Sequence, residues 1–290
     1  MYYLLIVSVI WGFSFGLFKG YLTGFDPNFT AFARLSLALL PFLYWVRWRR
    51  LPNPILQMQL LGIGAIQFGI MYSAYNLSFK YLQAYQVAVF TIFTPLYVSV
   101  WSDARSGRFR SGNLLLAALA VAGTGLIAYR SGTWNQVLIG FSLMQLANVC
   151  FAIGQVEYVR LRPKFAGRSD LEIFAWVIAG GALITGITTG FSHGWGGLRV
   201  LQLHQVAVLI YLGVVATGLG FYWWNKGAAQ VSTATLATFN NLKIPFAVAA
   251  SIICFGEHVN WARFLIGSAL LITALFISES AGRQRAGKGG

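Results

Sequence analysis

The sequence is poor in charge, and acidic residues are especially scarce. Only 10% of its 290 residues are charged and Asp and Glu together number seven, whereas 57% of the residues are hydrophobic. A soluble domain carries about 25% charged residues. Too few polar side chains are therefore present to cover a globule in water, and we expect the chain to lie in a lipid bilayer.

Cysteine and histidine are also scarce. Cys150 and Cys254 fall within apolar runs, where a thiol behaves as a small hydrophobic side chain, so the sequence indicates no disulfide framework. The three histidines lie in loops or at the edges of apolar runs, and no pair stands at ligand spacing with a carboxylate inside such a run. Because no nucleophile–base pair is evident either, we expect neither an enzyme nor a cofactor.

Basic residues, by contrast, give the chain a net charge of +14 and gather in every second loop between apolar runs. Fourteen lie in the loops of one side and in the tail: Arg47, Arg49, Arg50, Arg105, Arg108, Arg110, Arg160, Arg162, Lys164, Arg168, Lys226, Arg283, Arg285 and Lys288. The loops of the other side hold three, Lys80, Arg130 and Arg199. Cytoplasmic loops of membrane proteins collect Lys and Arg, so both termini are predicted to be cytoplasmic. The spread of this charge over short loops favours lipid headgroups and argues against nucleic acid as a partner.

The apolar runs predict an all-α integral membrane protein with ten transmembrane helices. Each run has about 20 residues, which is enough to cross a hydrocarbon core of about 30 Å. The predicted spans are 2–22, 29–48, 57–79, 84–102, 111–130, 136–159, 171–192, 203–226, 231–255 and 260–279. No segment is left that could fold as a separate soluble domain, so any site must lie within the helix bundle.

Two proline-containing segments suggest that the chain is an internal repeat. Thr94-Pro95-Leu96-Tyr97 and Ile244-Pro245-Phe246-Ala247 each lie within a span and precede a span rich in small residues. Five spans per half is an odd number, so the halves would have opposite orientation, as in many transporters. We therefore predict two inverted five-helix repeats, 1–132 and 133–280, followed by a basic cytoplasmic tail, 281–290.

The same prolines are candidate gating points. Proline cannot donate a backbone hydrogen bond, so Pro95 is expected to leave the Thr91 carbonyl free and Pro245 that of Asn241. Such groups are tolerated in a membrane where protein or a cavity satisfies them. Two packed kinks with local hydrogen bonds are the alternative interpretation.

Three cations are predicted inside or near the spans: Lys19, Arg34 and Lys243. All seven carboxylates are placed in loops or at span ends, so these cations lack an evident protein partner. A charge within a membrane usually faces a cavity or a partner. An anionic small-molecule substrate would supply one, although snorkelling to the headgroups remains an alternative that suits Lys19 well and Arg34 partly.

Aromatic and amide side chains recur at helical spacing in several spans. Gly12, Gly16 and Gly20 share a face suited to close helix contact, and amides cannot face lipid unsatisfied. These inward-facing stripes complete the predicted substrate-binding set, which beside Arg34 and Lys243 contains Trp11, Phe15, Tyr72, Tyr75, Asn76, Gln145, Asn148, Trp224 and Asn241.

The ten-span plan resembles the EamA-type branch of the drug/metabolite transporter superfamily. Pro245, Phe255-Gly256-Glu257 and Gly267 follow that branch's pattern, whereas Ser102-Asp103 stands where a Gly-Glu pair would be usual. A closer resemblance, to the YigM-type bacterial biotin transporters, rests on six blocks in order. These are Trp11–Phe15, Gln67–Tyr72, Phe90–Tyr97, Gln145–Asn148 with Phe151–Gly154, Leu212–Gly218 with Trp224-Asn225, and Asn240-Asn241.

The resemblance implies import of biotin across the bacterial inner membrane by alternating access, with no protein partner indicated. Arg34 or Lys243 could pair with the biotin carboxylate, amides with the ureido ring, and aromatic side chains with the apolar body. The alternative is an exporter of amino acids or related metabolites, whose ammonium group would call for a mid-membrane carboxylate that the sequence lacks. A structural or signalling role would not need the cations and prolines. Proton symport, uniport and exchange all stay open at this stage.

Overall fold

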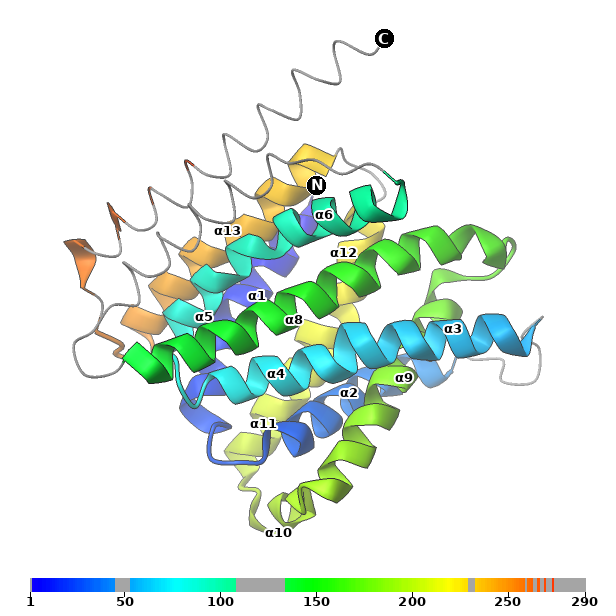
Figure 1. The fold of residues 1–290 in the computed structure, drawn as a ribbon. Helices are drawn as coiled ribbons and strands as arrows, with labels where there is room; N and C mark the ends of the chain where they lie inside the picture. Colours follow the sequence, from blue (N-terminus) through cyan, green and yellow to red (C-terminus); the bar gives the residue numbers. More distant parts are fainter. Residues whose placement is uncertain are drawn as a thin grey trace.

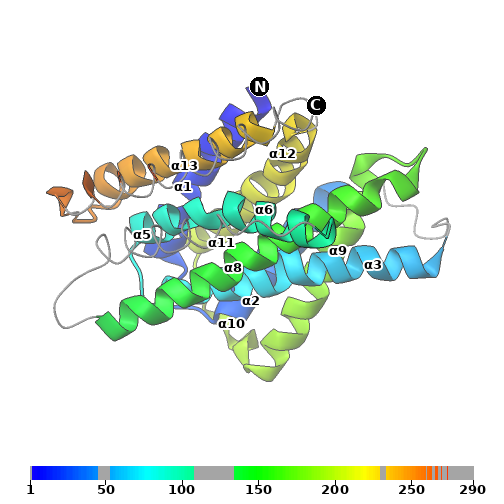
Figure 2. The same ribbon diagram turned by 45° about the horizontal axis from the view of Figure 1, so that its top comes forward.

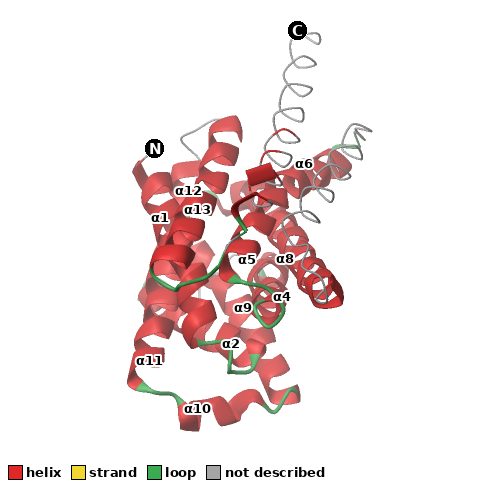
Figure 3. Ribbon diagram, turned by 90° about the vertical axis from the view of Figure 1, so that its left-hand side faces the viewer, coloured by secondary structure: helices red, strands yellow, loops and turns green. Residues whose placement is uncertain are grey.

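A computed structural model describes residues 2–44, 53–107, 134–228 and 233–258, together with residues 260–262, 265, 266, 269 and 273. Every regular element in these ranges is a helix, as Figure 3 shows by colour. The predicted fifth span and most of the tenth lie outside the described residues. So do Arg47, Arg49, Arg50, Arg108, Arg110, Arg130, Gly267, the side chain of Asn225 and the tail.

The first four predicted spans coincide with helices. These are α1 Tyr2–Tyr21, α2 Pro27–Leu43, a third span of α3 Pro54–Gly64, η1 Ala65–Ile70 and α4 Met71–Ser78, and a fourth of α5 Ala84–Phe90, η2 Thr91–Phe93 and α6 Thr94–Arg105. Spans six to nine are also confirmed. They are α8 Trp134–Leu161, α9 Asp170–Phe191, the run of α11 Leu203–Ile210, η5 Tyr211–Leu219 and α12 Gly220–Ala228, and α13 Thr233–Ile253; η3 Arg162–Phe165, η4 Gly194–Gly196 and α10 Gly197–Val200 lie between them.

Six helical runs in this part of the chain are long and apolar enough to cross a membrane: Tyr2–Tyr21, Pro54–Ser78, Ala84–Arg105, Asn135–Phe165, Asp170–Phe191 and Leu203–Trp224. Helix starts follow ordinary capping chemistry. Asp26 accepts hydrogen bonds from the backbone N–H groups of Asn28 (3.0 Å) and Phe29 (2.9 Å), and Pro27 opens α2. Asn53 and Pro54 start α3 in the same way.

Two of the spans contain a π-helical segment that the sequence analysis did not predict. Ala65–Ile70 interrupts the third span and Tyr211–Leu219 the eighth. A π-helical turn holds one extra residue and is frequent at functional sites. The two segments lie in the corresponding span of each half of the chain.

Several helix pairings of one half of the chain recur in the other half (Figures 1 and 2). Span one packs against spans nine and eight, and span six against spans four and three. Span two packs against η5 and span seven against η1, while α2 and α9 contact each other. Each of these pairings recurs when five is added to, or subtracted from, the number of both spans.

The connections gather at two ends of the bundle. At one end Lys19 reaches the carbonyl of Phe79, and the rings of Tyr21 and His204 are in contact. At the other end Arg105 pairs with Glu157, and Lys226 lies over the Tyr3 ring. The described basic loops, at Arg105, at 160–168 and at Lys226, belong to this second end, as their alternation along the sequence predicts.

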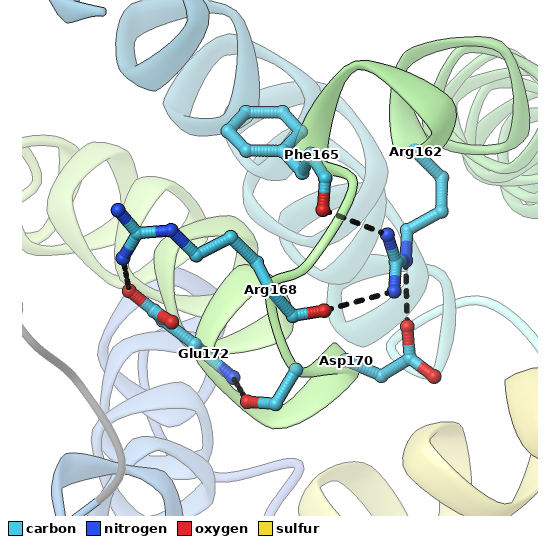
Figure 4. Close-up of polar contacts among 6 residues, drawn as sticks. Arg162, Phe165, Arg168, Asp170 and Glu172 are labelled. Atoms are coloured by element: carbon cyan, nitrogen blue, oxygen red, sulfur yellow. Dashed lines mark hydrogen bonds and ion pairs between the residues drawn. The ribbon is translucent and has the colours of Figure 1, made fainter. Parts of the chain in front are cut away.

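The loop from α8 to α9, at this cationic end, is held by its own charges (Figure 4). Arg162 pairs through Nε with Asp170 Oδ1 at 2.6 Å and donates to the carbonyls of Phe165 and Arg168 at 3.2 and 3.1 Å. Arg168 Nη1 lies 2.7 Å from Glu172 Oε1. Arginine side chains therefore hold the backbone of this loop in place.

Glycine allows the closest helix contacts. The glycine face of α1 contacts α13, as predicted: a Cβ atom at Gly12 would lie 2.6 Å from the Cβ of Phe246, and Gly16 faces Phe255. On α3, Gly64 packs directly on the backbone carbonyl of Val177 in α9.

We predict that Gly64→Ala destabilises the protein by about 1–3 kcal/mol, because a methyl group there would force α3 away from the α9 backbone. Gly62→Ala, two residues earlier, is the control, since nothing lies within 4 Å of its added Cβ. Thermal unfolding in detergent should show a lower melting temperature for the first variant alone. Equal melting temperatures for both variants would contradict the close contact.

Candidate substrate-binding site

A break in the fourth span shapes one wall of the site. The helix tightens into a 3₁₀ turn over Thr91–Phe93, and Pro95 lies in the first turn of α6. The Thr91 carbonyl accepts from the Thr94 N–H, so the expectation that Pro95 leaves it free is wrong. The carbonyl that takes a side-chain partner is that of Phe90, which accepts from Asn148 Nδ2 at 2.8 Å.

The expected break at Pro245 is absent. Helix α13 continues from Thr233 to Ile253 with Pro245 inside it. A proline removes one backbone hydrogen bond of a helix. Helix α13 nevertheless stays helical on both sides of Pro245. Among the described residues, therefore, only the fourth span is interrupted at its proline.

A cavity with about 600 Å³ of empty space, part of it open to the surroundings, lies between the helices at mid-span. Seven of the predicted substrate-binding residues line it: Trp11, Phe15, Arg34, Tyr72, Tyr75, Asn148 and Lys243. The remaining lining residues are Ser14, Met71, Thr91, Thr94, Met144, Ala147, Phe151 and Phe221. The wall is thus mainly aromatic and apolar, with a few polar groups and two cations, which is the usual composition of a small-molecule site.

Arg34 is the principal cation of this cavity and is 4% exposed. Its Nε donates to Thr217 Oγ1 at 2.6 Å, and its Cζ lies 4.3 Å from the centre of the Tyr72 ring. Its Nη1 is buried and has no hydrogen-bond partner among the residues that the structure describes. A buried charged donor without an acceptor is costly, so this nitrogen is poised for an acceptor that the protein itself does not supply.

Thr217 fixes the direction of that guanidinium from the π-helical segment η5. Its hydroxyl donates to the Leu212 carbonyl at 2.8 Å, which leaves its oxygen lone pairs for other donors. One donor is Arg34 Nε, and the Tyr72 hydroxyl lies 2.9 Å away as the second. The sequence analysis missed Thr217 as a site residue, although it falls in one of the quoted blocks.

Lys243 is the second cation of the cavity and is 7% exposed. Its Nζ donates to Asn240 Oδ1 at 3.1 Å and lies 5.4 Å from the centre of the Trp11 ring. Trp11 in turn donates from Nε1 to the Ala216 carbonyl at 2.8 Å, next to Thr217. Trp11 and η5 therefore connect the two cations.

Lys19 does not belong to the cavity. It is half-buried and donates to the carbonyls of Phe79 and Leu82 at 2.6 and 2.8 Å, where α4 ends. The prediction of three cations without protein partners is therefore wrong for Lys19.

Four other predicted binding residues lie behind the cavity wall. Asn76 donates to the Pro27 carbonyl and to Thr30, both at 3.1 Å, and so fastens α4 to the start of α2. Gln145 accepts from the Tyr97 hydroxyl at 3.1 Å, and Asn241 Oδ1 lies 3.4 Å from Asn240 Nδ2. Trp224 is 2% exposed and packs on Trp11, with ring centres 5.1 Å apart.

Comparison with known families identifies the kind of protein. The model of the EamA-like transporter family matches residues 1–129 and again residues 138–279. The chain belongs to the EamA-like transporter family. It is therefore a multi-pass membrane protein of a family of transporters, not of enzymes, as the composition predicted.

Curated relatives extend over nearly the whole chain. The "Probable biotin transporter" of Pseudomonas aeruginosa is 36% identical over 98% of this chain and 99% of its own length. The "Biotin transporter" of Salmonella typhimurium is 35% identical over 94% of this chain and 91% of its own. A more distant relative, the "Probable amino-acid metabolite efflux pump" of Escherichia coli, is 23% identical over 97% of this chain and 95% of its own.

We predict that Thr217→Val destabilises the protein by about 2 kcal/mol, because Arg34 Nε and the Tyr72 hydroxyl would lose a buried acceptor. Thr217→Ser keeps the hydroxyl and should restore most of the loss. The measurement is thermal unfolding of both variants in detergent. Wild-type stability in the valine variant would show that Thr217 does not hold the guanidinium.

Proposed function

We propose that this chain imports biotin across the bacterial inner membrane by alternating access. The observation that carries the proposal is the unpaired, buried Arg34 Nη1 at a cavity whose lining contains no carboxylate. A cationic cavity lined mainly by apolar and aromatic side chains suits an organic anion that, like biotin, has an apolar body and a carboxylate. The relatives named as biotin transporters support the same substrate.

The chemistry of biotin fits the groups present. Its carboxylate would accept from Arg34 and lie near Lys243. Asn148 would face the ureido ring, while Trp11, Phe15, Tyr72 and Tyr75 would cover the apolar ring and chain. In this proposal Asn76, Gln145, Trp224 and Asn241 act from behind the wall by holding the lining residues in place.

We infer two inverted repeats of five helices each, 1–132 and 133–280. The helix pairings repeat with a shift of five spans, the π-helical segments occupy spans three and eight, and the family model matches the chain twice. A central cavity lined from both halves agrees with the position of the site in transporters of this design.

Alternating access requires one end of the cavity to close while the other opens. Toward the end that holds Lys19, the tilted rings of Phe18 and Phe79 are in contact with their centres 4.8 Å apart. The centre of the Tyr75 ring lies 5.0 Å from that of Phe79. We propose this aromatic cluster as the closed gate. The 3₁₀ turn before Pro95 and the lost hydrogen bond at Pro245 are the proposed points of bending.

Orientation follows from charge. The end of the bundle with Arg105, Arg162 and Lys226 is proposed to face the cytoplasm, together with both termini and the basic tail 281–290. The closed aromatic gate would then face the periplasm.

Export of an amino acid or related metabolite is the second candidate, and it is favoured by the distant efflux relative. Such a substrate carries an ammonium group. The cavity offers two cations and no carboxylate among its lining residues, so it would repel that group. Biotin import therefore accounts better for the cavity.

We predict saturable uptake of labelled biotin when the protein is expressed in cells that lack their own biotin carrier. Arg34→Gln should weaken uptake by roughly 30-fold or more at low biotin concentration, which corresponds to about 2 kcal/mol for an unpaired buried carboxylate. Arg160→Gln removes an exposed charge at the cationic end and is the control. Wild-type uptake by the Arg34 variant would reject the carboxylate clamp, and no uptake by inserted wild-type protein would reject the substrate.

A further inference from the structure

Lys243 has surroundings that suit a neutral amine better than a permanent charge. It lies on α13 and is 7% exposed at a cavity lined mainly by aromatic and apolar side chains. Its contacts are the amide oxygen of Asn240 and the face of Trp11, both neutral groups. Both contacts are available to an –NH₂ group, which can still donate to the amide oxygen.

Among the residues that the structure describes, no carboxylate is positioned to keep Lys243 charged. Helix α13 packs against α1, α5 and η2, and none of these four elements contains Asp or Glu. The nearest carboxylate along the chain, Glu257, accepts from the backbone N–H groups of Ala84 and Tyr85 at 2.7 and 3.1 Å. Glu157 on α8 is bound to Trp101 and Arg105 at the cationic end.

The remaining titratable or charged groups of these elements and of the cavity are basic or phenolic. On α1 and α5 they are Tyr2, Tyr3, Lys19, Tyr21 and Tyr85, and on the cavity wall Arg34, Tyr72 and Tyr75. Lys19 is bound to two carbonyls away from the cavity. The charge that Lys243 meets across the cavity is thus the guanidinium of Arg34, of the same sign.

Of the two cations only the lysine can give up its charge. Arginine stays protonated in proteins, whereas a buried lysine loses its proton when water is excluded and a like charge is near. An arriving carboxylate reverses both conditions, because it brings a negative charge and hydrogen-bond acceptors to the ammonium. Binding of an organic anion and protonation of Lys243 therefore favour each other.

We propose that Lys243 is the proton site of the carrier, which takes up one proton with each biotin anion on one side and releases both on the other. The inference rests on the proposed function and adds the coupling ion to it. In the empty carrier the cavity holds Arg34 alone as a charge, +1. In the loaded carrier the guanidinium, the ammonium and the carboxylate again sum to +1, so the two halves of the cycle move equal and opposite charge and one complete turnover is electroneutral.

The test uses purified full-length protein in liposomes, with biotin counterflow measured first as evidence of substrate exchange. Net biotin uptake is then driven either by an inside-alkaline pH gradient with the membrane potential clamped at zero, or by a membrane potential at equal pH. Wild-type protein should respond to the pH gradient and not to the potential. The external medium should become more alkaline by one proton per biotin taken up, beyond any change in protein-free liposomes.

Lys243→Met and Lys243→Arg each remove the side chain that can gain and lose a proton. The methionine is always neutral, and the arginine is always charged. In both variants the loaded cavity carries one positive charge fewer than the empty cavity. Uptake should therefore lose its response to the pH gradient and become faster with an inside-positive potential. Counterflow is expected to be weaker in the Met variant than in wild-type protein, because Lys243 lines the cavity and its ammonium is lost. Lys80→Met removes an exposed lysine outside the cavity and should keep wild-type coupling.

The outcomes separate this inference from the substrate assignment. Counterflow by wild-type protein with net uptake that follows the potential and ignores the pH gradient would overturn the proton site alone. Uptake driven by the pH gradient in either Lys243 variant would do the same. Absence of biotin counterflow in wild-type protein would overturn the proposed substrate, and the proton coupling with it. If one Lys243 variant fails to insert, the other variant and the wild-type response to the two gradients still decide.

Discussion

The cost of burying an unpaired charge dominates this molecule. Arg34 cannot lose its proton, yet it is 4% exposed and one of its nitrogens has no acceptor. The described part of the protein supplies partial compensation through Thr217, the Tyr72 ring and the Tyr75 hydroxyl, and leaves Nη1 without an acceptor. The protein folds despite this unsatisfied donor, and an anion in the cavity would be favoured because it would supply the missing acceptor. The proposed substrate, the proposed gating and the proposed role of Lys243 all follow from that imbalance.

Backbone irregularity in the spans is matched by side-chain hydrogen bonds beside the cavity. The 3₁₀ turn after Phe90 is accompanied by a bond from Asn148 to the Phe90 carbonyl, and η5 places Thr217 over the carbonyl of Leu212. A bilayer offers no water to unsatisfied backbone groups, so irregular segments persist only where such partners exist. The same side chains that complete the backbone also line or orient the cavity. In the proposed function, stability and substrate binding therefore depend on the same few residues, Asn148 and Thr217 above all.

The spans and the two ends of the bundle could be predicted because hydropathy and loop charge are properties of the chain itself. Arg34, Lys243 and the aromatic residues of α1 and α4 could be placed near a cavity because lipid excludes them from the outer surface. Asn76 and Gln145 show the limit of that reasoning, because an inward-facing amide can bond to another helix instead of to a substrate. The π-helical segments, Thr217 as the partner of Arg34 and the uninterrupted helix at Pro245 depend on neighbours far away in sequence. Periodicity within one span carries no information about them.

The central claim is that the cavity recognises a carboxylate through Arg34. The most direct test is equilibrium binding to the detergent-solubilised protein, followed by calorimetry, with biotin and biotin methyl ester as paired ligands. The two differ only in the charge and donor–acceptor character of one end. The account predicts saturable binding of biotin. It predicts that the affinity for the ester is lower by roughly 30-fold or more, because the ester leaves the guanidinium without an anion. Equal affinity for the two ligands would contradict it.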